Sequence, residues 1–451
     1  MNYPVWDVPF LGSGWVVGIM AIIHIFLSHF AVGGGLFLPV MEAHARKHGD
    51  EAMLRWLRKH ARFFLIVTGV AGAGTGVGIW VVIALANPQG VGHLIHGFVL
   101  GWATEWIVFI AEMACITAYY YGWDRLTPER HLKVGWLYAI CSWLTLAVIN
   151  GIITFMLTPG KGWTESHWMW DGFFNPTYAP SLIMRTLVMW ALAGVYAFWT
   201  AATIEDLDLK ERVLQFSARW VLPAYVLLPL LGGWYFLNIP PVSREVLQVG
   251  MAGAAAGNFS MATRVTMLTV MSTATIGVIV YFGPFRNARA FTRGMAGAVA
   301  VVALLATGAS EWAREVARKP YVIRNVMYSN GVRVEQVDAF QREGYLPNSV
   351  WAREYAALKG DTAMARGEAI YRGQCVACHT WDGYRSMQKF MTPRNLDSAR
   401  NMVRMLRSRD PKENIYSKFM PPLAATEAEG EQLAAYLYQR AHPGPVAVAR
   451  K

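Results

Sequence analysis

Eight apolar stretches of the chain reach or approach the length of roughly 20 residues that a helix needs to cross a bilayer. They lie near residues 15–40, 63–86, 98–121, 133–157, 181–203, 220–238, 255–283 and 294–312. The third and eighth are the least uniform, because each contains glutamate. After Trp312 the pattern changes to mixed polar and charged residues. The pattern predicts an all-α fold, in which a polytopic bundle of about eight transmembrane helices precedes a smaller all-α domain.

The basic residues between these stretches follow an alternating pattern. Six Lys and Arg residues lie in 42–62, and three each lie in 122–133, 204–219 and 284–293. The intervening loops contain none in 87–97, Lys161 alone in 158–180 and Arg244 alone in 239–254. Because Lys and Arg favour cytoplasmic loops, this alternation places the N-terminus outside the bacterial cytoplasmic membrane. An even number of spans then places the C-terminal domain on the same, periplasmic side.

The composition agrees with a membrane protein. The chain is 54% hydrophobic and 16% charged, whereas a soluble domain has about 25% charged residues. Much of the net charge of +11 comes from the basic loops, so nucleic-acid binding is not expected. The N-terminal MNYPVWDVPF has no basic region and no A-x-A-like site follows it, which indicates a retained span instead of a signal peptide. Cys115 and Cys141 lie in apolar runs, as small core residues do.

Residues 374–380 read QCVACHT and have the C-x-x-C-H spacing of covalent heme attachment. Cys375 and Cys378 would bond the heme vinyl groups, and His379 would be the proximal ligand of the iron. A zinc ribbon would need a second ligand pair, and a thioredoxin-like motif would need a βαβ context. The sequence provides neither, so covalent heme c is the expected cofactor.

The second axial ligand is expected downstream of this motif. Met420 lies in SKFMPPLAA, about forty residues after the histidine. Met387 and Met391 also follow the motif but lack the Met-Pro context. Helical patterns flank these residues, in ARGEAIYRGQCVACH and TEAEGEQLAAYLYQR. The arrangement resembles a class I cytochrome c over about 361–442.

These patterns divide the chain into three segments. We expect a transmembrane domain over 1–315, a linker over 316–360 and a cytochrome c domain over 361–451.

Ionisable residues within the apolar stretches are candidates for function, because such residues are costly in a bilayer. His24 lies about 14 Å into the first span at 1.5 Å per residue, and we expect it to bind heme iron. His29 is five residues further along and faces a different side of the helix. Glu105 and Glu112 are seven residues apart on one helical face. They could carry protons, or they could be neutral hydrogen-bonding groups.

The membrane part resembles subunit I of cytochrome bd-type quinol oxidases. The stretches that carry the resemblance are GIMAIIHIFLSHFAVGGG, GVAGAGTGVGIW, FIAEMACITAYYYGWDRL, VINGIITFMLTP and, more loosely, EWAREVARKPYVI. The resemblance implies that His24 binds a high-spin heme, either b-type or d-type, without a covalent bond. It also matches Glu112 to an acidic residue of the family's third helix, and it implies a second membrane subunit.

The chain departs from that family at its other heme ligands. Arg185 stands where the family's low-spin heme histidine would fall, and the partner methionine would fall near Thr266, next to Met267. The late glutamate ligand would fall near Gly308, one turn from Glu311. The long quinol-binding loop is reduced to NIPPVSREVLQVGMAGAAAGNFS. The low-spin heme and the usual quinol site are therefore both in question.

The remaining histidines and one outer loop have less specific patterns. His93 and His96 are candidate ligands of a second heme or ordinary loop residues. Four histidines among the basic residues are expected to be solvated, namely His44, His48, His60 and His131. The aromatic loop 158–180 is either an interfacial belt or a platform for the C-terminal domain.

The resulting hypothesis is a multiheme redox protein of a respiratory chain. Electrons would pass between the outside heme c and a bd-like membrane heme that reduces O2, as in a terminal oxidase. The alternative is an electron-transfer subunit between quinol, or a partner subunit, and cytochrome c, without substrate chemistry. A third hypothesis is a heme sensor or a membrane anchor for the cytochrome.

Overall fold

The structure is a computed structural model that describes residues 3–245 and 261–443, and the chain forms two compact units. The membrane unit comprises residues 20–78 and 97–317. The tail unit comprises residues up to 19, residues 79–96 and the chain from residue 318. Parts of the first two apolar stretches therefore belong to the same unit as the C-terminal region.

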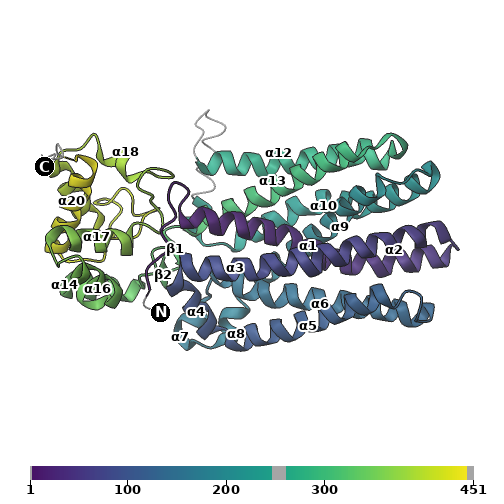
Figure 1. Cartoon of the computed structure of the whole chain (residues 1–451), viewed down its shortest axis with the longest axis horizontal. Coiled ribbons are helices and arrows are strands. Elements are labelled where there is room, and N and C mark those ends of the chain that lie inside the picture. The colour runs from purple at the N-terminus through teal and green to yellow at the C-terminus, as the bar shows by residue number, and fades with distance from the viewer. Residues whose placement is uncertain (1–2, 246–260, 444–451) are drawn as a thin grey trace, which may run out of the picture. The chain divides into compact units, whose positions relative to one another are not determined.

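Eight helices of the described residues are long and apolar enough to cross a membrane, which confirms the predicted number of spans. They are α1 (Ser13–Lys47), α2 (Glu51–Ile66) with η1 (Val67–Gly72) and α3 (Ala73–Ala86), α5 (Val99–Tyr121), α6 (Pro128–Phe155), α9 (Tyr178–Ala201), α10 (Leu207–Asn238), α12 (Met261–Val280) with η2 (Tyr281–Phe285), and α13 (Arg293–Arg318). The long helices of the membrane unit run side by side (Figure 1). Shorter helices connect them: α4 (Pro88–Gly97), α7 (Lys161–Ser166), α8 (Met169–Phe173) and η3 (Ala288–Ala290).

Several helices extend into segments that the sequence pattern assigned to loops. α1 continues to Lys47, and α2 begins at Glu51, where the Asp50 side chain accepts a hydrogen bond from the Met53 amide. Likewise α10 begins at Leu207, after the capping residue Asp206. Such caps satisfy amides that have no partner within the helix. Hydropathy detects only the apolar part of a helix, so it misses the polar ends. The start of the predicted seventh stretch, 255–260, lies outside the described residues.

Small residues let the helices of the membrane unit approach closely. A Cβ atom on Gly33 of α1 would lie 1.9 Å from the Met189 carbonyl oxygen of α9. A Cβ atom on Gly194 would lie 2.6 Å from the Ser217 carbonyl oxygen of α10. Close backbone contact of this kind is a main source of helix association in membranes. These contacts fix α9 between α1 and α10.

The expectation that all four histidines near the basic loops are solvated is wrong for His60 and His131. Both are fully buried, because α2 and α6 continue past the predicted span ends and turn these side chains inward. His60 stacks on Trp56 with ring centroids 5.0 Å apart, and its Nδ1 lies 2.9 Å from the Thr200 hydroxyl. His44 and His48 are exposed, as predicted.

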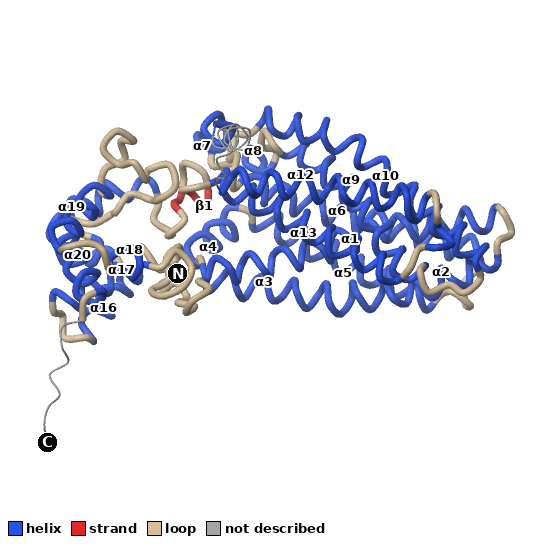
Figure 2. Tube along the Cα trace, turned by 90° about the horizontal axis from the view of Figure 1, so that it is seen from above, coloured by secondary structure: helices blue, strands red, loops and turns tan. Residues whose placement is uncertain are grey.

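The C-terminal region of the tail unit is a small helical domain with one pair of short strands (Figure 2). The strands β1 (Tyr321–Ile323) and β2 (Met327–Tyr328) are antiparallel, with Tyr321 opposite Tyr328. The helices are η4 (Val334–Gln336), α14 (Val337–Glu343), α15 (Tyr345–Asn348), α16 (Val350–Leu358), α17 (Ala363–Gln374), α18 (Met387–Met391), α19 (Leu396–Leu406) and α20 (Glu427–Ala441). A Cβ atom on Gly367 would lie 2.3 Å from the Gln432 carbonyl oxygen, so glycine permits α17 to cross α20.

The core of this domain also includes part of the segment assigned to the linker. Tyr345, Leu346 and Ala352 are buried with residues of α17 and α20 in one hydrophobic cluster. The Glu429 carboxylate of α20 accepts 2.8 Å hydrogen bonds from the amides of Tyr345 and Leu346. The predicted boundary between residues 360 and 361 stays a prediction. α15, which lies before that boundary, is hydrogen-bonded to α20, which lies after it.

Candidate heme and proton sites

The C-x-x-C-H motif forms a tight turn at the end of α17. Cys375 caps the helix, and its carbonyl oxygen accepts hydrogen bonds from the amides of Cys378 at 3.0 Å and His379 at 2.9 Å. The His379 Nδ1 donates to the Arg385 carbonyl oxygen at 2.9 Å, which leaves Nε2 as the nitrogen with a free lone pair. Burial lowers the pKa of His379, which favours the neutral imidazole that iron binds. Both cysteines are free thiols, so the three residues fit covalent heme c.

The loop that carries Met420 is tied to this motif. The Gln374 side chain, immediately before the first cysteine, donates to the Ala424 carbonyl oxygen at 2.9 Å and accepts from the Ala424 amide at 3.0 Å. Met420 is only partly buried, whereas Met387 and Met391 belong to the hydrophobic core. Among these three methionines, Met420 therefore has the side chain that the core does not already use.

The N-terminal segment packs directly against the heme motif within the tail unit. The Phe10 carbonyl oxygen accepts a hydrogen bond from the Tyr384 amide at 2.7 Å. Trp15, in the first turn of α1, meets Tyr384 edge-on with ring centroids 5.6 Å apart. A Cβ atom on Gly383 would lie 1.9 Å from the Phe10 carbonyl oxygen, so only glycine fits there. Sequence reasoning missed this contact, because no local pattern connects residues 370 positions apart.

His24 of α1 lies against the glycine-rich part of α3 in the membrane unit. Its Nδ1 is 3.1 Å from the Thr75 hydroxyl, which itself donates to the Ala71 carbonyl oxygen at 2.8 Å. The hydroxyl therefore accepts from Nδ1–H, and the Nε2 lone pair stays available for a metal. A Cβ atom on Gly76 would lie 3.2 Å from the imidazole, so the glycine lets α3 approach the histidine closely. The histidine thus has a fixed ring and a nitrogen lone pair free for iron, and in this respect it fits a heme.

Glu112 of α5 is buried, and it has two hydroxyl neighbours on α6. It accepts hydrogen bonds from Tyr138 at 3.2 Å and from Thr145 at 3.3 Å. Glu105, two turns earlier, is partly buried. Their predicted place on one helical face is consistent with this arrangement, but their role as proton carriers stays a prediction.

Comparisons with known proteins match two regions of this chain. A family model described as "Cytochrome bd terminal oxidase subunit I" matches residues 13–239, just over half of the chain. The chain belongs to the cytochrome bd terminal oxidase subunit I family. A second family model, "Cytochrome c", matches residues 364–441. The predicted resemblances to both families are confirmed, and the chain is a membrane protein of heme-based electron transfer.

A solved structure shows the same fold in the membrane part. The bd oxidase from Geobacillus thermodenitrificans is similar with a TM-score of 0.56 and 18% identity, over 69% of this chain and 88% of that one. Among curated proteins no match was found.

In this bd-family chain, Arg185 is part of a buried ion-pair cluster. The Arg185 guanidinium is 3.4 Å from one oxygen of Glu311, and Arg314 donates to the other oxygen at 2.8 Å. An arginine cannot ligate iron, because it stays protonated and has no free lone pair. The carboxylate of Glu311 is engaged on both sides, so it is also a poor ligand. His29 donates from Nδ1 to the Ile25 carbonyl oxygen of its own helix at 2.9 Å.

The two histidines on the predicted outer loop lie on the short helix α4. His96 is exposed, and its Nδ1 donates to the Gly92 carbonyl oxygen at 2.6 Å. His93 is partly buried. A ligand role for either stays a prediction.

A buried acid–base cluster that the sequence did not predict joins α1, α5 and α6. The fully buried Glu42 accepts hydrogen bonds from His131 Nδ1 and the Tyr119 hydroxyl, each at 2.8 Å, and from Arg46. The His131 Nε2 lies 2.8 Å from the Tyr119 carbonyl oxygen. Both ring nitrogens thus lie within hydrogen-bond distance of oxygen atoms of the cluster. In the sequence, Glu42 is the first residue of the basic segment 42–62, and nothing local marks it as buried.

Replacing His131 by alanine should destabilise the membrane unit. The change removes one of the hydrogen-bond donors of the buried Glu42 carboxylate and leaves a cavity, which we expect to lower the free energy of unfolding by about 3 kcal/mol. Equilibrium unfolding of the purified protein in detergent would measure this. His44→Ala, at an exposed position of α1, is the control and should change stability little. Equal stability of the two variants would contradict a structural role for the cluster.

Proposed function

We propose that this chain is a bd-type oxidoreductase in which electrons reach the His24 heme from heme c. The observation that carries the proposal is the packing of the segment before α1 on the heme c motif. α1 is one continuous helix that carries Trp15 in its first turn and His24 nine residues later. The residue that contacts the heme c motif and the residue proposed to bind the membrane heme are therefore close together along the chain.

The chemistry of the site divides between the hemes and the chain. When bound, the membrane heme would supply the iron at which O2 is reduced, and heme c would supply its electrons. Thr75 would hold His24 in the tautomer that leaves Nε2 free. His379 and Met420 would be the axial ligands of heme c, and Arg385 would orient the histidine. The methionine would raise the heme potential relative to a second histidine.

The cluster at Arg185 supports an electron route that does not begin at quinol in this chain. Arg185 stands where the family's low-spin heme histidine would fall, and it forms an ion pair with Glu311 instead. The shortened loop after α10 removes much of the sequence that would bind quinol, although most of it lies outside the described residues. We therefore place electron entry at heme c, on the periplasmic side. A second membrane subunit and a soluble redox partner complete the proposed assembly.

Glu112 is proposed to carry protons to the reducing site. Glu112→Gln keeps the shape of the side chain and one accepting oxygen but cannot exchange a proton, so we expect O2 reduction about a hundredfold slower. The measurement is oxygen consumption per heme, with CO binding as a check that the heme site is intact. Thr117→Val on the exposed face of the same helix is the control. A full rate in the glutamine variant would remove Glu112 from the proton route.

Reaction of the reduced full-length protein with O2 tests the main proposal. After rapid mixing, the reduced heme c band should disappear within a single turnover, because its electrons pass to the membrane heme. In His24→Ala the heme c band should remain reduced on the same timescale. If heme c in the unaltered protein also stays reduced, the chain is an electron-transfer subunit without oxygen chemistry. The number of hemes per chain distinguishes the oxidase and the electron-transfer subunit from a membrane anchor, which would contain heme c alone.

A further inference from the structure

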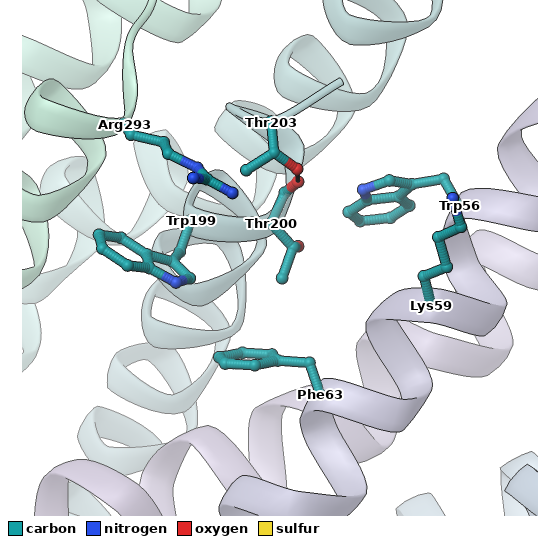
Figure 3. Close-up of a pocket in the computed structure, with 7 residues that line it drawn as sticks. All are labelled: Trp56, Lys59, Phe63, Trp199, Thr200, Thr203 and Arg293. Carbon is teal, nitrogen blue, oxygen red and sulfur yellow. Dashed lines mark hydrogen bonds between the residues drawn. The ribbon is translucent and has the colours of Figure 1, made fainter. Parts of the chain in front are cut away.

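A pocket of about 210 Å³ opens among three helices of the membrane unit, far along the sequence from the proposed heme residues. Figure 3 shows the side chains that line it. They are Trp56, Lys59 and Phe63 of α2, Trp199 and Thr200 at the end of α9, Thr203 just after it, and Arg293 at the start of α13. The pocket thus lies at helix ends, beside the loops whose basic residues predict the cytoplasmic side.

Some cations near this pocket are neutralised by acidic partners, and others are not. Arg58 pairs with Asp124, Arg212 with Asp50, and Arg289 with Asp208 and Glu211. Within the described part of the chain, Lys59 and Arg293 form no ion pair. Their charges therefore remain available to an anion in the pocket.

The other lining groups suit a phosphate-bearing amphiphile. In Figure 3 the Arg293 side chain reaches from α13 toward Thr200 and Thr203. Arg293 is also the first residue of α13, a 26-residue helix whose amino end favours an anion. Trp199 is 46% exposed, and Ile66, one turn along α2 from Phe63, is 53% exposed. Apolar surface continues from the pocket along the part of α2 that enters the bilayer.

We propose that this pocket binds the phosphate headgroup of an anionic membrane phospholipid. Lys59 and Arg293 would contact the phosphate, and the acyl chains would lie along Phe63, Trp199 and Ile66. Basic pockets between transmembrane helices on the cytoplasmic side commonly bind such lipids. A free phosphate ion shares the headgroup chemistry, but it has no acyl chain to contact the aromatic side chains of the pocket. The site is independent of the proposed electron route.

The test compares the purified full-length protein with Lys59→Gln/Arg293→Gln in detergent. Native mass spectrometry after incubation with phosphatidylglycerol should show one retained lipid fewer on the double variant. Addition of phosphatidylglycerol should raise the melting temperature of the unaltered protein more than that of the double variant. Phosphatidylcholine, which has no net charge, should not distinguish the two proteins.

Two controls make the result decisive. Arg62→Gln removes a charge from an exposed position of α2 outside the pocket and should retain the unaltered lipid count and melting shift. Sodium phosphate alone should produce no shift that depends on Lys59 and Arg293. Equal lipid retention by the unaltered protein and the double variant would overturn the proposal. An equal shift with phosphate alone would replace the lipid by a soluble anion and would also overturn it.

Discussion

Replacement of both Cys375 and Cys378 by serine is expected to leave the chain without covalent heme. Only thioether bonds from these two cysteines would retain the heme after denaturation. The other described cysteines lie in the membrane unit. Heme staining of the denatured protein should fall from full intensity to background. Oxygen consumption driven through heme c should be lost with it, because the proposed electron entry is gone.

The matched control for this experiment is Cys115→Ser/Cys141→Ser. These cysteines lie on α5 and α6 of the membrane unit, outside the C-x-x-C-H turn, and their replacement should leave the stain intact. A stain of unchanged intensity in the Cys375/Cys378 double variant would show that the turn does not attach heme. Loss of only the stain, with CO binding retained, would be the expected sign that the two heme sites fold separately.

His24→Ala is expected to remove the CO-reactive heme of the membrane unit. The imidazole is the proposed metal ligand on α1, it lies against the glycine-rich part of α3, and Thr75 holds its orientation. The dithionite-reduced, CO-treated protein should lose its high-spin difference band, and O2 reduction should fall to background. Thr75→Val keeps the histidine but removes the hydrogen bond that orients it. Loss of such a partner typically weakens metal binding by about tenfold to hundredfold, and we expect a loss of heme affinity of that size.

His44→Ala serves as the control because His44 lies on the same helix but is exposed. It should retain the CO band and the oxygen consumption of the unaltered protein. An unchanged CO band in His24→Ala would move the high-spin heme to another ligand and remove the basis of the proposed oxygen chemistry.

The sequence predicted those features that depend on local pattern. Eight apolar stretches became eight helices, and the C-x-x-C-H motif became a turn at the end of α17 with the histidine oriented by Arg385. Hydropathy and motif spacing are strong signals because each is contained within about 20 residues. Helix ends were predicted less well, because charged residues continue a helix beyond the apolar part that hydropathy detects.

Features that depend on distant partners could not be predicted. His131 and Glu42 are 89 residues apart, and only the packing of α1 against α6 makes their positions buried. Among basic residues a histidine is usually solvated, so His60 and His131 had no local signal of burial. The contact of Phe10 with Gly383 is the extreme case, because it joins the beginning of the described chain to its last domain.

The contact between Phe10 and Tyr384 also sets an order of events during biogenesis. The ribosome completes residue 10 long before residue 384, so the segment around Phe10 stays unpaired while the intervening helices are synthesised and inserted. Contacts between such distant residues form late, because closing a long loop is entropically costly. The Phe10 segment can make this contact only after the turn at Gly383 has formed in the cytochrome c domain. Docking of the earlier-synthesised segment would thus report that the later-synthesised turn has formed.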